Sequence, residues 1–166
     1  TDIMGIEIHP EARVSELADI EASTRGTRFV LGAGSVVDSF VKVKPAGGPG
    51  DIMIGERVVI NSGCVLYTGY GITIGNDVAV AANCVFAAVN HEFASKDRLI
   101  RDQRFQPSRG GIVLEDDVWI GAGCVLLDGS IVRKGAVIGA MSLVRGEVAA
   151  YSINAGNPLA HIGWRR

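Results

Sequence analysis

The chain has 166 residues, 16 of them lysine or arginine and 18 aspartate or glutamate. This length fits one domain, and a formal net charge of -2 argues against the concentrated basic surface that nucleic-acid binding requires. No basic segment followed by an apolar one opens the chain, and no uninterrupted apolar run is long enough to span a membrane. We therefore expect a cytoplasmic protein that does not insert into membranes and does not bind nucleic acid.

Apolar residues recur at every sixth position along most of the chain. A helix repeats about every 3.6 residues and a simple strand every two, so neither explains a period of six. In chain order the repeated positions form six groups of three: Ile8, Val14, Ile20; Leu31, Val37, Val43; Ile54, Ile60, Leu66; Ile74, Val80, Phe86; Leu114, Ile120, Leu126; and Val132, Ile138, Val144.

Each six-residue unit predicts one short strand followed by a corner, and glycines such as Gly55, Gly75, Gly121 and Gly139 mark the corners. Three units close a triangle, and coils stacked about 4.8 Å apart pair strand on strand. We expect an all-β parallel β-helix of about six triangular coils over residues 1–150. Residues 151–166 should cap it as a short C-terminal tail or helix.

In the uninterrupted run from Leu114 to Val144 the fifth residue of each unit is small or β-branched, and all three cysteines, Cys64, Cys84 and Cys124, occupy the fifth position of a unit. They show no C-x-x-C spacing, and an odd number gives no disulfide framework. We interpret them as core thiols and expect no metal site.

The repeat is interrupted at residues 26–30, 44–49, 68–72 and after His91, and we expect these insertions to leave the stack at corners. The last forms a long inserted loop, residues 92–111. A loop longer than about 12 to 15 residues in a compact domain is usually functional or disordered. It is rich in basic residues: Lys96, Arg98, Arg101, Arg104 and Arg109.

Four motifs carry a resemblance to a known family: Val89-Asn-His-Glu-Phe, Asp117-Val-Trp-Ile-Gly-Ala, Val137-Ile-Gly-Ala and Tyr151-Ser-Ile-Asn-Ala-Gly-Asn-Pro. In these the chain resembles the hexapeptide-repeat acetyltransferases, which include the galactoside, maltose and xenobiotic acetyltransferases. The order of the motifs looks most like the enzymes that acetylate sugars of O-antigens and other surface polysaccharides. The resemblance covers most of residues 50–162 and implies a left-handed helix and acyl transfer from acetyl-CoA.

His91 matches the catalytic histidine of that family. An imidazole, with an ordinary pKa of about 6.5, can take a proton from an acceptor hydroxyl or amine as it attacks a thioester and can then protonate the leaving thiolate. The other two histidines, His9 and His161, we interpret as structural or exposed.

The resemblance also suggests residues that bind the acceptor. Asn61 matches an asparagine that contacts the sugar in the galactoside enzymes, although a structural asparagine at a corner remains the alternative. Asn90 and Glu92 flank His91 and are candidates to touch the substrate or to orient the imidazole.

For the cofactor, the resemblance places acetyl-CoA along a prism edge between two subunits, near Gly121, Ala122 and Ala140. It assigns an oxyanion role to the Ala122 amide. Trp119, whose side chain should point away from the interior, and Asn157 of the Ala-Gly-Asn-Pro turn complete this group; an aromatic residue at a subunit interface is the alternative for Trp119.

The sequence departs from the family pattern where the cofactor phosphates are expected: Met141 replaces a glycine, Arg145-Gly146 replaces Thr-Lys, and Ala160 occupies a position that is usually basic. Arg145, Arg165 and Arg166 can supply the missing charge, because guanidinium groups match phosphate geometry. A solvated basic tail is the alternative.

We expect a homotrimer that acts on a sugar or nucleotide-sugar acceptor, because the family's site needs residues from two subunits. Three other functions are alternatives for this sequence: a non-catalytic β-helix scaffold with the loop as its binding surface, a γ-type carbonic anhydrase, and transfer of a formyl or longer acyl group. The carbonic anhydrase needs three imidazoles on one zinc ion, which His9, His91 and His161 are too far apart in the repeat to supply.

Overall fold

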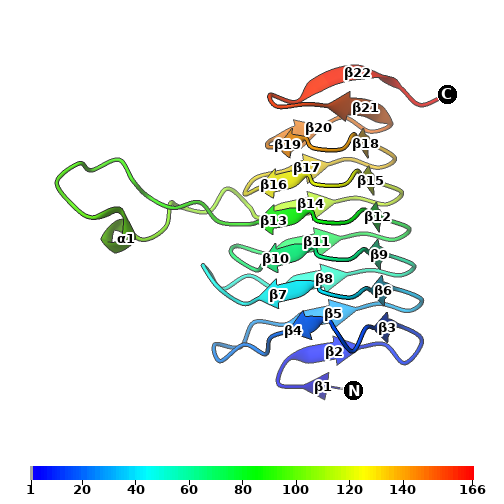
Figure 1. Ribbon diagram of the computed structural model, residues 1–166, viewed down its shortest axis with the longest axis horizontal. Helices are drawn as coiled ribbons and strands as arrows, with labels where there is room; N and C mark the ends of the chain where they lie inside the picture. Colours follow the sequence, from blue (N-terminus) through cyan, green and yellow to red (C-terminus); the bar gives the residue numbers. More distant parts are fainter. Residues whose placement is uncertain (1) are drawn as a thin grey trace.

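The computed structural model of the protein describes residues 2–166, which form a triangular stack of short strands with one long loop projecting from its side (Figure 1). The chain begins at one end of the stack and finishes at the other. Three sheets, each running the height of the stack, form the three walls of the prism.

The strands of each wall follow in spatial order. Sheet A contains β1 (Asp2–Ile3), β2 (Ile6–Ile8), β5 (Phe29–Leu31), β8 (Ile52–Ile54), β11 (Ile72–Ile74), β14 (Ile112–Leu114), β17 (Ile131–Val132) and β20 (Glu147–Val148). Sheet B contains β3 (Arg13–Val14), β6 (Val36–Val37), β9 (Val59–Ile60), β12 (Ala79–Val80), β15 (Trp119–Ile120), β18 (Val137–Ile138), β21 (Ser152–Ala155) and β22 (Ala160–Trp164). Sheet C contains β4 (Asp19–Ile20), β7 (Lys42–Lys44), β10 (Val65–Tyr67), β13 (Val85–Ala87), β16 (Val125–Leu127) and β19 (Leu143–Val144).

Successive strands visit sheets A, B and C in turn, so three strands make one coil, and the pairs between coils are parallel and in register. Six complete coils run from β2 to β19, and β20 and β21 begin another. The parallel β-helix predicted from the repeat is confirmed, and its three walls of parallel strands are consistent with the left-handed type that the resemblance implies.

The repeated apolar positions fill the interior, as predicted. In the second to sixth coils every one of them is buried, including Phe86, Ile120 and Ile138 with no exposed surface. Ile8, Val14 and Ile20 of the first coil are only partly buried, because this coil is covered on one side alone.

From Leu114 onward every fifth position of the repeat is buried too. Cys64, Cys84 and Cys124 are fully buried free thiols, one above another in successive coils, which confirms them as core residues. A hydrogen bond with Cys84 and burial together raise the pKa of the Cys124 thiol. Where the fifth residue is serine, its hydroxyl is satisfied: Ser130 Oγ donates to the carbonyl oxygens of Leu127 and Val144.

The turns that join the walls form three columns, which we name the A–B, B–C and C–A corners after the sheets they connect. All four interruptions of the repeat lie on the C–A corner, where the chain passes from β4 to β5, β7 to β8, β10 to β11 and β13 to β14. The other two corners remain as short, regular turns. Insertions were expected at corners, and their confinement to one corner was not.

Both ends of the stack finish in an antiparallel strand pair. At the first end β1 pairs with β2, and at the last end β22 pairs with β21. The C-terminal segment, expected as a tail or a helix, is therefore a strand; its backbone bonds with β21 occupy a sheet edge that would otherwise be open to another chain. The one α-helix of residues 2–166, α1 (Ile100–Gln103), lies in the projecting loop.

Candidate active site

His91 lies on the C–A corner, where the chain leaves β13 for loop 92–111, and its side chain is exposed. Its Nδ1 lies 2.8 Å from the main-chain carbonyl oxygen of Glu92. A carbonyl oxygen can only accept a hydrogen bond, so Nδ1 carries the proton in the neutral ring and Nε2 keeps a free lone pair. The imidazole is therefore oriented as a base that faces away from its own main chain.

The base of the loop holds His91 in place. His91 and Phe105 form an antiparallel bridge, and their rings pack with centroids 5.5 Å apart. On either side of this bridge the Glu92 amide donates to Arg104 O and the Gln106 amide donates to Asn90 O. The two ends of the loop are thus bonded across His91.

The flanking candidates behave differently. The Glu92 carboxylate is turned to its own main chain, since one oxygen accepts hydrogen bonds from the amides of Ala94 and Phe93, and these bonds lower the pKa of the Glu92 carboxyl. It orients His91 through its carbonyl rather than its carboxylate. The Asn90 side chain lies beside a cleft and forms no hydrogen bond within residues 2–166, which leaves its amide available to a ligand.

The cleft has a volume of about 390 Å³ and lies between the two ends of the loop and the coils above them. The residues from the loop and its base are Asn90, His91, Phe93, Gln106 and Arg109, and those from the coils are Leu127, Asp128 and Arg145.

Five residues of this cleft were not predicted as site residues from the sequence: Phe93, Gln106, Arg109, Leu127 and Asp128. The Asp128 carboxylate is buried and accepts hydrogen bonds from the amides of Arg109 and Gly111, at 2.9 and 2.7 Å. It thereby fastens the returning end of the loop to the coil above. One feature of the sequence could have indicated Asp128. It is an acidic residue in the turn Asp128-Gly-Ser, which lies at the same corner as the inserted loop. Arg109 was noted only as one of the loop's basic residues.

The predicted cofactor residues lie elsewhere, on the B–C corner. Gly121 and Ala140 are stacked so closely that a Cβ on Gly121 would lie 2.5 Å from the Ala140 nitrogen. Ala122 and Ala140 are exposed, and within residues 2–166 neither amide donates a hydrogen bond. These free amides run along the outer edge of the prism and face solvent.

Three further candidates lie on or near the same corner. Asn61 is at its turn after β9 and its Nδ2 donates to Val80 O, which gives it a structural role in the stack. Asn157 is exposed in the turn between β21 and β22, at the last end of the corner. Trp119 lies on the outer face of sheet B and is 45% exposed, so it points away from the interior as predicted.

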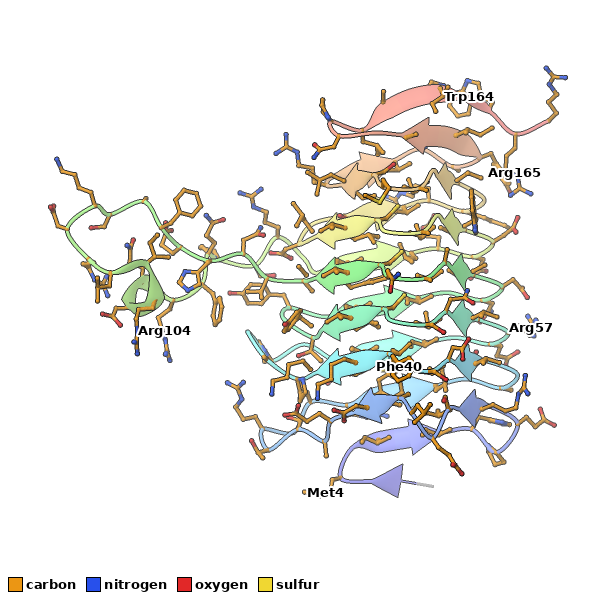
Figure 2. The ribbon with its side chains drawn as sticks, viewed as in Figure 1. Met4, Phe40, Arg57, Arg104, Trp164 and Arg165 are labelled. Atoms are coloured by element: carbon orange, nitrogen blue, oxygen red, sulfur yellow. The ribbon has the colours of Figure 1, made fainter. Side chains whose placement is uncertain are left out.

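The three candidate phosphate-binding arginines are not together. Arg145 lies on the C–A corner in the His91 cleft. Arg165 is at the A–B corner, where it bonds to the Asp117 carboxylate and to Gly135 O, and it lies on the opposite side of the prism from the loop that carries Arg104 (Figure 2). Arg166 is exposed beyond β22.

One chain therefore divides the predicted site between corners. Asn90, His91, Glu92 and Arg145 share the C–A corner, whereas Asn61, Gly121, Ala122, Ala140 and Asn157 are on or near the B–C corner. The full width of sheet C separates the two columns.

His9 follows β2 in the first coil, and His161 lies in β22 at the other end of the stack, so three imidazoles of one chain cannot meet at His91. Across residues 2–166 no group of three histidine, cysteine, aspartate or glutamate side chains could hold a metal ion. No helix in the same range is long and apolar enough to cross a membrane.

A family model described as bacterial transferase hexapeptide (six repeats) matches residues 111–146. Among curated proteins, WbbJ of Escherichia coli, named for lipopolysaccharide biosynthesis O-acetyl transfer, is 29% identical over 80% of this chain and 67% of its own length. Rv3034c of Mycobacterium tuberculosis, which is named as an acetyltransferase, is 31% identical over 66% of this chain. The chain spans 36% of that protein.

Among solved structures, a variant of AntD from Bacillus cereus has the same fold, with a TM-score of 0.81 over 97% of this chain and 84% of the other, at 20% identity. AntD is described as an N-acyltransferase in complex with dTDP-4-amino-4,6-dideoxyglucose and coenzyme A. The expected enzyme class, an acyltransferase, is the class named for both curated relatives, and the likeness to AntD shows the same fold.

Proposed function

We propose that this chain is a hexapeptide-repeat transferase that moves the acetyl group of acetyl-CoA to a hydroxyl or amine of a sugar-type acceptor. His91 is the general base. The observation that carries this proposal is the hydrogen bond from His91 Nδ1 to Glu92 O, which leaves Nε2 free at the wall of a cleft.

The transfer needs one base and no covalent enzyme intermediate. The acceptor oxygen or nitrogen attacks the thioester carbon while His91 Nε2 takes the acceptor's proton. The carbon–sulfur bond then breaks, and the proton passes from Nε2 to the leaving thiolate of CoA. Because Nδ1 stays bonded to Glu92 O, the imidazolium formed in between is stabilised by a carbonyl dipole.

The separation of the corners supports a site built between two copies of the chain. The flat outer walls of the prism can pack so that the C–A corner of one copy faces the B–C corner of the next, and a closed ring of three such contacts is a homotrimer. Acetyl-CoA then lies between His91 of one copy and Gly121, Ala122 and Ala140 of the other. The free Ala122 amide is the donor to the oxyanion, because it has no other bond to give up.

The remaining cofactor assignments are Trp119, on the outer face next to that corner, and Asn157, at its last end. Arg165 and Arg166 are the candidates for the phosphates. Arg165 lies at the A–B corner, on the other side of sheet B from Ala122 and Ala140, so a phosphate bound by it must reach across the outer face of that sheet and must replace its bond to Asp117.

The acceptor class is supported by the relatives. WbbJ is named for O-acetyl transfer in lipopolysaccharide biosynthesis, and AntD is described with an amino sugar linked to a nucleotide. Surface polysaccharide biosynthesis, with a hydroxyl or an amine as acceptor, is the proposed setting.

The test is thiol release from acetyl-CoA, measured against a panel of hydroxy- and amino-sugars and their nucleotide-linked forms. We expect His91→Ala to lower kcat by about 10²- to 10⁴-fold, the usual contribution of a general base. The matched control is His9→Ala, in the first coil, which should keep full activity. Unchanged activity in His91→Ala would remove His91 as the base; no transfer to any acceptor together with no CoA binding by calorimetry would support the scaffold instead.

A further inference from the structure

We infer that the cleft beside His91 is an anion site, and that the acceptor carries a carboxylate or phosphate group bound by Arg109 and Arg145. This inference rests on the proposed function, because it gives a substrate class to the same site. The two guanidinium groups come from separate elements: Arg109 from the returning end of loop 92–111 and Arg145 from the turn after β19.

Neither guanidinium is neutralised by the protein. Within residues 2–166, Arg109 and Arg145 form no ion pair, whereas Arg133, on the A–B corner, bonds to the carboxylates of both Glu115 and Glu147. Two positive charges therefore line one cleft of about 390 Å³ without a fixed counter-ion.

The carboxylates near the cleft are already occupied by main-chain amides. Both Asp128 oxygens accept bonds from amides of the loop, and a Glu92 oxygen accepts two more. Asp128 does lie in the cleft and offsets part of its positive charge, but it is buried and directed at the main chain. It holds Arg109 in position without pairing with its guanidinium.

The stem of Arg109 is also fixed by the coil above it. Gly129 has a φ of +90°, and a Cβ built there would lie 3.0 Å from Arg109 Cβ and 3.7 Å from Arg109 Cδ. Because Gly129 has no side chain, the side chain of Arg109 can pass directly over it. The guanidinium is thus presented to the cleft by two local constraints, the Asp128 bond to its amide and the packing of its stem.

The other side chains of the cleft suit a sugar ring. Asn90 and Gln106 have amide groups without a hydrogen bond in the described chain, and each amide can both donate to and accept from hydroxyls. A guanidinium forms two parallel bonds to a carboxylate or phosphate. The cleft therefore fits a sugar with one acidic group, oriented so that a hydroxyl or amine faces His91.

The anion could instead be a phosphate of CoA, which is the role that the sequence suggested for Arg145. The test therefore separates the two sources. Transfer is measured with matched acceptors, glucose against glucuronic acid and methyl glucoside against glucose 1-phosphate, and each is assayed with both acetyl-CoA and S-acetylpantetheine as donor. The variants are Arg109→Gln and Arg145→Gln, with Arg104→Gln as the loop control.

We expect a KM for the acidic member of a pair at least about tenfold below that for the neutral member, consistent with charge-assisted bonds of about 1.5 to 3 kcal/mol. Arg109→Gln and Arg145→Gln should each remove most of this preference and leave the KM for acetyl-CoA unchanged. Arg104→Gln should have no effect. Equal KM values for acidic and neutral acceptors in the unaltered protein would overturn the inference. So would a raised KM for acetyl-CoA in the variants that is absent with S-acetylpantetheine.

A binding experiment without the donor distinguishes failure of the anion site from failure of the proposed function. Calorimetry with glucuronate should show binding that both arginine variants lose and high salt weakens. If such binding occurs but no acceptor is acetylated, the anion site stands and the acyl transfer does not. If neutral sugars are acetylated in a His91-dependent reaction and glucuronate does not bind, the acyl transfer stands and the anion site does not.

Discussion

In the prism, the main chain of each strand bonds to the coils above and below, and apolar side chains fill the interior. In loop 92–111, the main chain is bonded largely by side chains: Gln103 bonds to Ser95 and to Arg98 O, and Glu92 bonds to two amides. The four residues of α1 include none that is buried. The prism is stabilised by contacts that repeat from coil to coil, and the loop is stabilised by individual polar contacts. The candidate base lies where the two meet.

The largest difference in stability should be seen when a phenylalanine is replaced in the prism and another is replaced in the loop. Phe86 is fully buried in the prism, and Phe93 in the loop is 64% exposed. Phe86→Ala should lower the free energy of unfolding by about 3 to 5 kcal/mol through lost contacts and a cavity. Phe93→Ala should change it by less than about 0.5 kcal/mol. Denaturant unfolding measures both, and similar losses would mean that the loop packs more tightly than its exposure indicates.

The next effect tests the close stacking of the corners. Gly121→Ala forces a Cβ to within 2.5 Å of the Ala140 nitrogen, and we expect a loss of about 1 to 3 kcal/mol, typical of overpacking. Gly163→Ala in β22 is the control, since nothing lies within 4 Å of its added Cβ. Thermal unfolding of the two variants gives the comparison. An unaffected Gly121→Ala protein would show that adjacent coils can separate at this corner.

A smaller effect should loosen the loop alone. Asp128→Asn replaces one accepting oxygen by a donor and so breaks one of the two bonds to the Arg109 and Gly111 amides, at a cost of about 1 to 2 kcal/mol. Hydrogen exchange should rise in residues 104–111 and stay unchanged in the strands of sheet B. Asp97→Asn, at an exposed position in the same loop, should alter neither. Uniformly faster exchange would indicate that Asp128 supports the whole stack.

The smallest effect should be seen at the cysteines. They are fully buried, which keeps a reagent from all three; the pKa of the Cys124 thiol is raised, whereas a hydrogen bond with Cys84 lowers the pKa of the Cys64 thiol, so burial alone protects Cys64. A thiol reagent should label none of the three in the folded protein and all three after denaturation. Rapid labelling of the folded protein would show that the B–C corner opens.

The sequence predicted the prism closely because its periodicity reports the interior directly: a residue such as Ile120 or Leu126 is apolar because it faces the core. Periodicity carries no information about which corner receives insertions, nor about an end strand such as β22, whose apolar residues, Ile162 and Trp164, are exposed. The sequence therefore did not predict that the C-terminal segment forms a strand.

The candidate site was predicted unevenly. His91 and the small residues Gly121 and Ala140 follow from motifs in the strands. The contacts of Asp128 and the cleft position of Arg109 do not, because each depends on how the returning loop meets the coil above it. That geometry is set by hydrogen bonds between residues 17 to 19 positions apart in the chain, within a segment that has no repeat.

The central claim is that one active site combines the C–A corner of one copy with the B–C corner of another. It is tested most directly by co-expressing His91→Ala and Ala140→Glu, two variants with separate tags, each expected to be inactive alone, and purifying the assemblies that carry both tags. A trimer that carries both variants has both corners intact at one of its three sites, so we predict about a third of the unaltered activity. Doubly tagged assemblies with no activity would show that the site is not shared between copies.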